Sequence, residues 1–129
     1  MKLNILLIES NFLMRIFLKN YLERTFSVLS YESADKALEN LSKEQIPDLI
    51  LKSFEIEKAD DVTTLRNNMF LRNLPIIMLT KEDKSNQRVA AFKMHATDCL
   101  SKPFNPQELV ERIYRVAVGR QQELRELAS

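Results

Sequence analysis

The sequence predicts an α/β domain built on an open parallel sheet with helices on both faces. Five short apolar segments alternate with five stretches of helical periodicity, in repeats of similar length. The connections between strands are expected to be right-handed. A chain of 129 residues, 45% of them hydrophobic, is sufficient for one domain with one core.

The strands are predicted from short apolar runs that end at polar residues. The first run, Ile5 to Ile8, is continuous enough to be covered on both faces. Pro47 breaks the chain before the third strand, and the fourth strand ends at Thr80. The five predicted strands are residues 2–8, 26–31, 48–52, 75–80 and 99–100.

Helices are predicted where apolar residues recur every three or four positions. Ser33 is the expected N-cap of the second helix. The fourth helix is expected over residues 84–94, through Val89, Ala90, Ala91 and Met94. The first, second and third helices are each expected to turn one apolar face inward. These faces are Leu13, Met14, Phe17, Leu18, Tyr21 and Leu22 in the first helix, Ala37, Leu38 and Leu41 in the second, and Val62, Leu65 and Met69 in the third, which spans residues 60–72.

The last helix has the clearest start signal. Asn105 is its N-cap, Pro106 takes the first helical position and Glu108 lies three residues after the cap. Residues 120–129 also favour helix. The three- and four-residue spacing continues across the glycine at position 119, through Leu109, Ile113, Val116, Arg120, Leu124 and Leu127. This pattern predicts a helix that leaves the domain, toward an output module or a second copy.

Composition excludes several classes of function. The 19 basic and 18 acidic residues nearly cancel, so no broad electrostatic attraction to nucleic acid or to an anionic membrane is expected. One cysteine, Cys99, cannot form an internal disulfide or a metal–thiolate cluster. With a single glycine, Gly119, the glycine-rich loops of nucleotide enzymes are absent. The N-terminus lacks the long apolar stretch of a signal peptide or membrane span, which favours a cytoplasmic domain.

Four segments occur in an order and spacing typical of one family: Ile5 to Ile8 before an acidic residue, PDLIL, PIIMLT and ATDCLSKPFNPQEL. Together they resemble the receiver domain of bacterial response regulators over roughly residues 3–118. The resemblance implies a flavodoxin-like (βα)5 fold, a doubly wound parallel sheet with strand order 2-1-3-4-5. Residues 1–119 would form this receiver-like domain, and residues 120–129 a helical extension or the start of a linker.

The resemblance also implies a chemistry, the transfer of a phosphoryl group from a histidine kinase to an aspartate. Two acids after the first strand and the acceptor after the third hold Mg²⁺, while a hydroxyl residue and a lysine contact the phosphoryl oxygens. Such transfer depends on positioning and on neutralisation of dense negative charge.

This sequence keeps part of that set. The acidic pair falls on Glu9 and Ser10, and the acceptor position falls on Ser53; Thr80 and Lys102 match the hydroxyl residue and the lysine. One of three expected carboxylates remains, which is a poor site for Mg²⁺. We therefore expect no metal, no cofactor and no catalytic residue in a degenerate phosphorylation pocket.

Two interpretations of Ser53 stay open at this point. Its hydroxyl could carry phosphate, or it could be a loop serine that fills the space of a former aspartate. The second is favoured, because the acid at position 10 is missing as well. With no phosphoryl group to meet, Lys102 is hypothesised to pair with Glu9; the alternative is a solvated lysine.

Further departures from the family pattern surround the pocket. Lys81 follows Thr80 where a small residue is usual, and either covers the pocket entrance or points to water. Cys99 takes the position of the switching aromatic residue and is expected to pack as a small apolar side chain. His95 replaces a glycine. A metal site at Asp60 and Asp61 is disfavoured, because acids are ordinary at a helix start.

The sequence thus favours a pseudo-receiver, a non-enzymatic module that acts by protein–protein contact. Its expected partners are a histidine kinase, another regulator or an output domain, with a homodimer possible through the fourth helix, fifth strand and fifth helix. Exposed groups expected on that face are Arg88, Phe92, Lys93, Arg112, Tyr114 and Arg115. Two alternatives remain: switching by phosphorylation at Ser53, and the receiver half of a regulator, transcriptional for example, whose output domain lies outside this chain. No direct contact with nucleic acid or membrane is expected.

Overall fold

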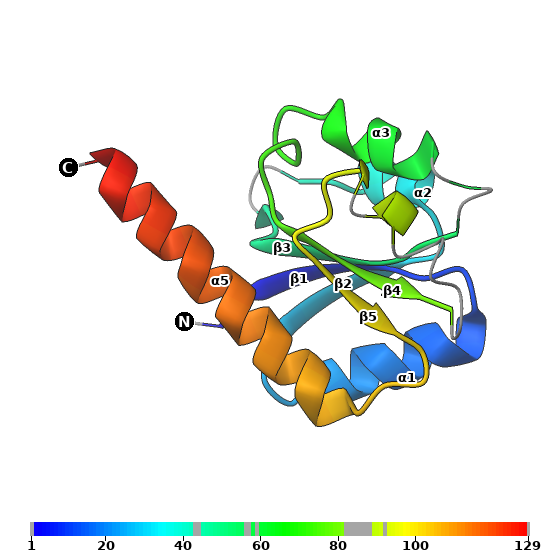
Figure 1. The fold of residues 1–129 in the computed structure, drawn as a ribbon. Helices are drawn as coiled ribbons and strands as arrows, with labels where there is room; N and C mark the ends of the chain where they lie inside the picture. The colour runs from blue at the N-terminus through cyan, green and yellow to red at the C-terminus, as the bar shows by residue number, and fades with distance from the viewer. Residues whose placement is uncertain are drawn as a thin grey trace.

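The computed structural model is a five-stranded parallel sheet in the order β2-β1-β3-β4-β5, flanked by helices (Figure 1). The order and class agree with the prediction. The structure describes residues 2–42, 45–55, 58, 60–81, 89–91 and 93–128. The elements in chain order are β1 (Asn4–Ile8), α1 (Phe12–Leu22), β2 (Ser27–Tyr31), α2 (Ala34–Glu39), β3 (Leu49–Ser53), α3 (Asp60–Arg66), β4 (Ile76–Thr80), β5 (Asp98–Ser101) and α5 (Pro106–Ala128).

The strands are in register at their carboxyl ends. Ile8 lies opposite Lys52, Ser53 opposite Leu79 and Thr80 opposite Ser101. Because all five strands are parallel, the loops that follow them leave from one edge of the sheet. This arrangement brings the residues after β1, β3, β4 and β5 close together.

Two apolar layers fill the space between sheet and helices. Side chains alternate along a strand, so Ile5 and Leu7 of β1 face one layer while Leu6 and Ile8 face the other. Helices α1 and α5 cover the first layer, and α2 and α3 cover the second (Figure 1). Burial on both faces explains why the strands are continuous apolar runs and not alternating ones.

Asparagine and serine side chains cap three helices. The Met14 amide donates to Asn11 Oδ1 at 2.9 Å to begin α1. Ser33 Oγ accepts from the Lys36 amide at 3.1 Å, and Asn105 Oδ1 accepts from the Gln107 amide at 2.9 Å. The predicted caps of α2 and α5 are therefore confirmed.

The predicted inward face of α1 is partly wrong. Leu18 and Leu22 are fully buried, and Met14 and Tyr21 pack against the core, but Leu13 is 76% exposed and Phe17 about half exposed. The apolar stripe of α1 is wider than the strip of helix that the sheet can cover. Leu13 and Phe17, both predicted to face inward, are therefore left at the surface.

Helix α3 is shorter than predicted, because the chain turns after Arg66. The Arg66 guanidinium donates to the carbonyl oxygens of Leu71 and Leu74, at 3.4 and 2.6 Å, and holds that turn. Met69 consequently lies in the turn and is mostly exposed, so its predicted place on the inward face is wrong. Val62 and Leu65 are buried as predicted.

The predicted helix over residues 84–94 falls largely outside the described residues. Residues 89–91 and 93 are helical, whereas positions 84–88 and 92, with the candidate surface groups Arg88 and Phe92, lie outside the described ranges. His95 follows with φ of 63°, a left-handed conformation that favours glycine. This conformation gives a physical reason for the glycine that the family resemblance implies there.

Helix α5 is continuous across Gly119 and extends beyond the sheet (Figure 1). Leu109, Ile113 and Ala117 in its first half are buried, whereas residues 121–128 are all exposed. Among the described residues, no helix has the length and apolarity required to cross a membrane.

Candidate functional site

The loops at the carboxyl edge of the sheet surround a cavity of about 650 Å³. It brings together five of the predicted pocket residues, from the ends of β1, β3, β4 and β5: Glu9, Ser10, Ser53, Lys81 and Lys102. Its remaining walls come from the α1 N-cap Asn11, from Leu13, Met14 and Phe17 of α1, and from Glu55 after β3. The register of the parallel strands creates this site.

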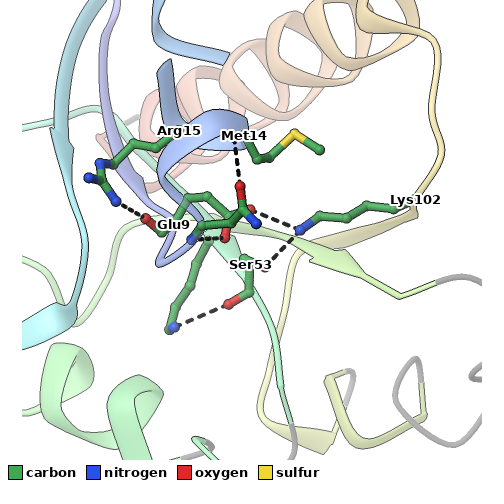
Figure 2. Close-up of polar contacts among 7 residues, drawn as sticks. Glu9, Met14, Arg15, Ser53 and Lys102 are labelled. Carbon is green, nitrogen blue, oxygen red and sulfur yellow. Dashed lines mark hydrogen bonds and ion pairs between the residues drawn. The ribbon is translucent and has the colours of Figure 1, made fainter. Parts of the chain in front are cut away.

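Lys102 is at the centre of the polar contacts in the cavity. Its ammonium donates to Glu9 Oε1 at 2.8 Å and to Ser53 Oγ at 3.0 Å (Figure 2). Glu9 is 2% exposed, so its charge is removed from water and is compensated by this contact. The hypothesised Lys102–Glu9 ion pair is therefore present.

The other groups of Glu9 are also engaged. Its Oε2 accepts from the Asn11 amide at 3.2 Å, and its backbone carbonyl accepts from Arg15 Nη1 at 2.7 Å (Figure 2). Both carboxylate oxygens have a donor within the chain. Charge-assisted bonds of this kind fix the carboxylate in one orientation.

Thr80 does not join these contacts. It is fully buried, and its hydroxyl lies 3.3 Å from Ser101 Oγ, between β4 and β5. Its backbone carbonyl accepts from the Lys102 amide at 2.7 Å, which aligns the start of the β5–α5 loop. In this structure the Thr80 hydroxyl contacts the neighbouring strand β5 and does not line the cavity.

Lys52 is a buried cation that the sequence analysis missed. It is 4% exposed, its Nζ lies 3.5 Å from Asp61 Oδ2, and it donates to the Ser53 carbonyl at 3.2 Å. Burial lowers the pKa of Lys52, and the charge of Asp61 partly opposes that effect. The available signal was strand alternation, since Lys52 shares a face with the buried residue Ile50 and so requires an acidic partner.

This pairing gives Asp61 a role other than metal binding. Within the described ranges, no three acidic, histidine or cysteine side chains are grouped to hold a metal ion. A second cavity, of about 310 Å³, lies beside Lys52 and Asp61 and is also bordered by Ser10 and Ser53. Ser53 therefore borders both cavities.

Lys81 and Cys99 differ in exposure. Lys81 is exposed at the border of the larger cavity, where it adds a positive charge to that of Lys102. Cys99 is buried and packs in the apolar layer with Met78 and Ala91, as expected of a small apolar side chain.

Arg112 forms a second polar cluster that was not predicted. Its Nη1 donates to both carboxylate oxygens of Asp98, at 2.9 and 2.8 Å, and its Nη2 donates to Glu108 at 3.1 Å. These bonds raise the pKa of Arg112. Of the groups expected on the face of the fourth helix, fifth strand and fifth helix, Lys93, Tyr114 and Arg115 are exposed, whereas Arg112 is partly buried and already paired.

A parallel sheet in the order 2-1-3-4-5, with its polar cluster at the carboxyl edge, defines a flavodoxin-like domain with the site at that edge. A model of the response regulator receiver domain matches residues 5–114, and the chain belongs to that family.

Curated relatives and a solved structure agree with this assignment. The chain is 36% identical over 83 residues to the transcriptional regulatory protein CpxR homolog of Haemophilus influenzae, covering 64% of this chain and 37% of that protein. It is 31% identical over 101 residues to the regulatory protein VanR of Enterococcus faecium, covering 78% of this chain and 42% of that protein. The crystal structure of a putative response regulator from Chloroflexus aurantiacus superimposes with a TM-score of 0.79 at 25% identity, covering 92% of this chain and 99% of that one. The chain spans about two fifths of the length of these two curated relatives.

Proposed function

We propose that this receiver is a degenerate one that signals by protein contact and not by phosphorylation of an aspartate. The observation that carries the proposal is the position of Lys102. Its ammonium joins Glu9 to Ser53 at the acceptor position, and these contacts occupy the groups that would otherwise meet a metal ion and a phosphoryl group. The proposal makes the domain a non-enzymatic module.

The pocket residues do not fit the Mg²⁺ that the family chemistry requires. Mg²⁺ prefers several hard oxygen ligands in near-octahedral array. Here Glu9 supplies one carboxylate, whose oxygens accept from Lys102 and from the Asn11 amide, while Ser10 and Ser53 supply neutral hydroxyls. A dication would also lie close to the positive charge of Lys102.

A surface on α1 supports action by protein contact. Four large apolar side chains at the start of this helix are exposed, and two of them border the cavity. A contiguous apolar patch of this kind is typical of interaction surfaces. Its members are Phe12, Leu13, Ile16 and Phe17.

The partner classes follow from the family. A histidine kinase, another regulator or an output domain would each be bound without transfer of a phosphoryl group. The two curated relatives described above are named as regulatory proteins and are longer than this chain. We also propose that the receiver body ends near Gly119, because residues 121–128 of α5 are all exposed. Residues 120–129 would then form an extension.

The test is incubation with Mg²⁺ and a small-molecule phosphodonor, followed by intact mass measurement. We expect an unchanged mass under conditions that phosphorylate a receiver with all three carboxylates. A stoichiometric phosphate adduct would overturn the proposal. If it mapped to Ser53, and the Ser53→Ala variant lost it, the alternative of switching at Ser53 would replace it.

A further inference from the structure

The core-facing stripe of α5 continues beyond the part of the helix that has a core to face. Leu109 and Ile113 are buried against the sheet. Val116, Arg120, Leu124 and Leu127 follow them on the same side of the helix at three- and four-residue steps, but Leu124 is 51% and Leu127 is 83% exposed. The second half of α5 therefore presents an apolar stripe with no described side chains covering it.

This stripe borders a groove of about 910 Å³. The groove lies between the end of α5 and the loops that precede β4 and β5, and Leu74 and Pro75 form part of its apolar wall. Arg120 crosses its edge and donates to the Asn73 carbonyl. Basic side chains border the groove: Arg66, Arg72, His95, Arg115 and Arg120.

The end of α5 is exposed within one copy of the chain. Residues 121–128 are all exposed, Leu124 and Leu127 among them. Burial of these two leucines against an apolar surface of a second copy would be favourable.

We propose that the groove receives the end of α5 from a second copy, in a reciprocal antiparallel pair centred between Gln121 and Gln122. In such a pair, residues equally distant from the centre lie at the same height. Leu127 then lies over Val116 of the other copy, and Glu123 lies beside its Arg120. Three complementary pairs thus follow from one choice of register, the third being Leu124 with Gly119.

The third pair explains why a glycine occurs at position 119. Glycine is unfavourable inside a helix, and a Cβ at this position would meet no atom within 4 Å in one copy. Packing within a single chain therefore does not explain the glycine. In the antiparallel pair it leaves space for Leu124 of the other helix, since small residues permit close approach of two helices.

This pairing uses α5 and not the phosphorylation pocket, so it is independent of the proposed function. Sedimentation velocity over a wide range of concentration should show reversible dimerisation of the intact chain. The double variant Leu124→Glu/Leu127→Glu should be monomeric. Val118→Glu, on the opposite face of the same helix, is the matched control and should dimerise like the unmodified protein.

A charge exchange tests the register and does not depend on any one variant folding well. Arg120→Glu and Glu123→Arg should each weaken dimerisation by about tenfold or more. Combining them restores opposite charges between the two helices and should recover most of the loss. Failure of the double variant to recover, with its helical circular dichroism retained, would refute the register.

Cross-linking tests the orientation. In a Cys99→Ala background, Gly119→Cys/Leu124→Cys should form an intermolecular disulfide rapidly, whereas Leu124→Cys alone should do so slowly. Faster cross-linking by Leu124→Cys alone would indicate parallel helices and overturn the proposal. An unmodified protein that stays monomeric at every concentration would also overturn the proposal.

Discussion

Lys102 Nζ lies 2.8 Å from Glu9 Oε1, although 93 residues separate them in the chain. The contact joins the end of β1 to the end of β5 across the carboxyl edge of the sheet, with Ser53 of β3 as a third member. The ends of three strands are thus joined by one ammonium group.

Removing one member of this pair should destabilise the fold. Lys102→Met leaves the buried Glu9 carboxylate without its countercharge, and we expect a loss of about 2–3 kcal/mol in the free energy of unfolding. Urea denaturation measures it. The double variant Glu9→Gln/Lys102→Met removes both charges and should recover at least half of that loss. If the double variant recovers none of the lost stability, the unpaired charge of Glu9 is not the cause of the destabilisation.

Lys52 should make stability depend on alkaline pH. Its pKa is lowered by burial, so between that lowered pKa and the ordinary value of 10.5 the unfolded chain binds more protons than the folded one. Stability attributable to Lys52 therefore rises with pH through this interval. Lys52→Met should equal or exceed the unmodified protein in stability near neutral pH, with the difference shrinking as pH approaches 10.5. Urea denaturation of both proteins at each pH checks this, and a difference that grows with pH would contradict it.

His95→Gly should stabilise the domain by about 1 kcal/mol. The left-handed backbone at φ of 63° is unfavourable for a residue with a Cβ and is accessible to glycine. His95→Ala is the control, because it removes the imidazole and keeps the Cβ. Thermal unfolding should place the glycine variant above both other proteins. Equal stabilisation by alanine would mean that the imidazole itself is unfavourable.

Restoring acids to the pocket should begin to restore metal binding. Ser10→Asp and Ser53→Asp together place three carboxylates at the edge of the sheet, and calorimetric titration with Mg²⁺ should then detect binding. Neither single variant should bind measurably. If the double variant also fails, Lys81 or the backbone of the loops prevents the geometry, and Lys81→Ala in the same background distinguishes the two.

The predicted features that the structure confirms depend mostly on local patterns. Ser33 and Asn105 cap their helices because each cap is formed within a few residues of the chain. The strand order and the location of the pocket came from several segments in register with a known family. The Lys102–Glu9 pair was predictable because, once that fold is assumed, the chemistry of a lone carboxylate requires a cation.

The errors have a common cause in packing. Leu13, Phe17 and Met69 were placed inward because apolar spacing shows which face of a helix is apolar, but not how much of that face the sheet covers. For Lys52 the missing information was its neighbour across the cavity. A buried cation requires an anion, but the sequence does not show which acid the fold brings within reach.

By itself, the sequence determined the class of fold, and it predicted the edge of the sheet that carries the candidate site. The tertiary structure alone decided that Lys102 reaches both Glu9 and Ser53, that Thr80 turns to Ser101, and that residues 121–128 of α5 are all exposed. The physical reason is the separation along the chain of the residues that interact. Propensities and caps are local properties of the chain, whereas ion pairing and burial depend on distances between segments that only the folded chain sets.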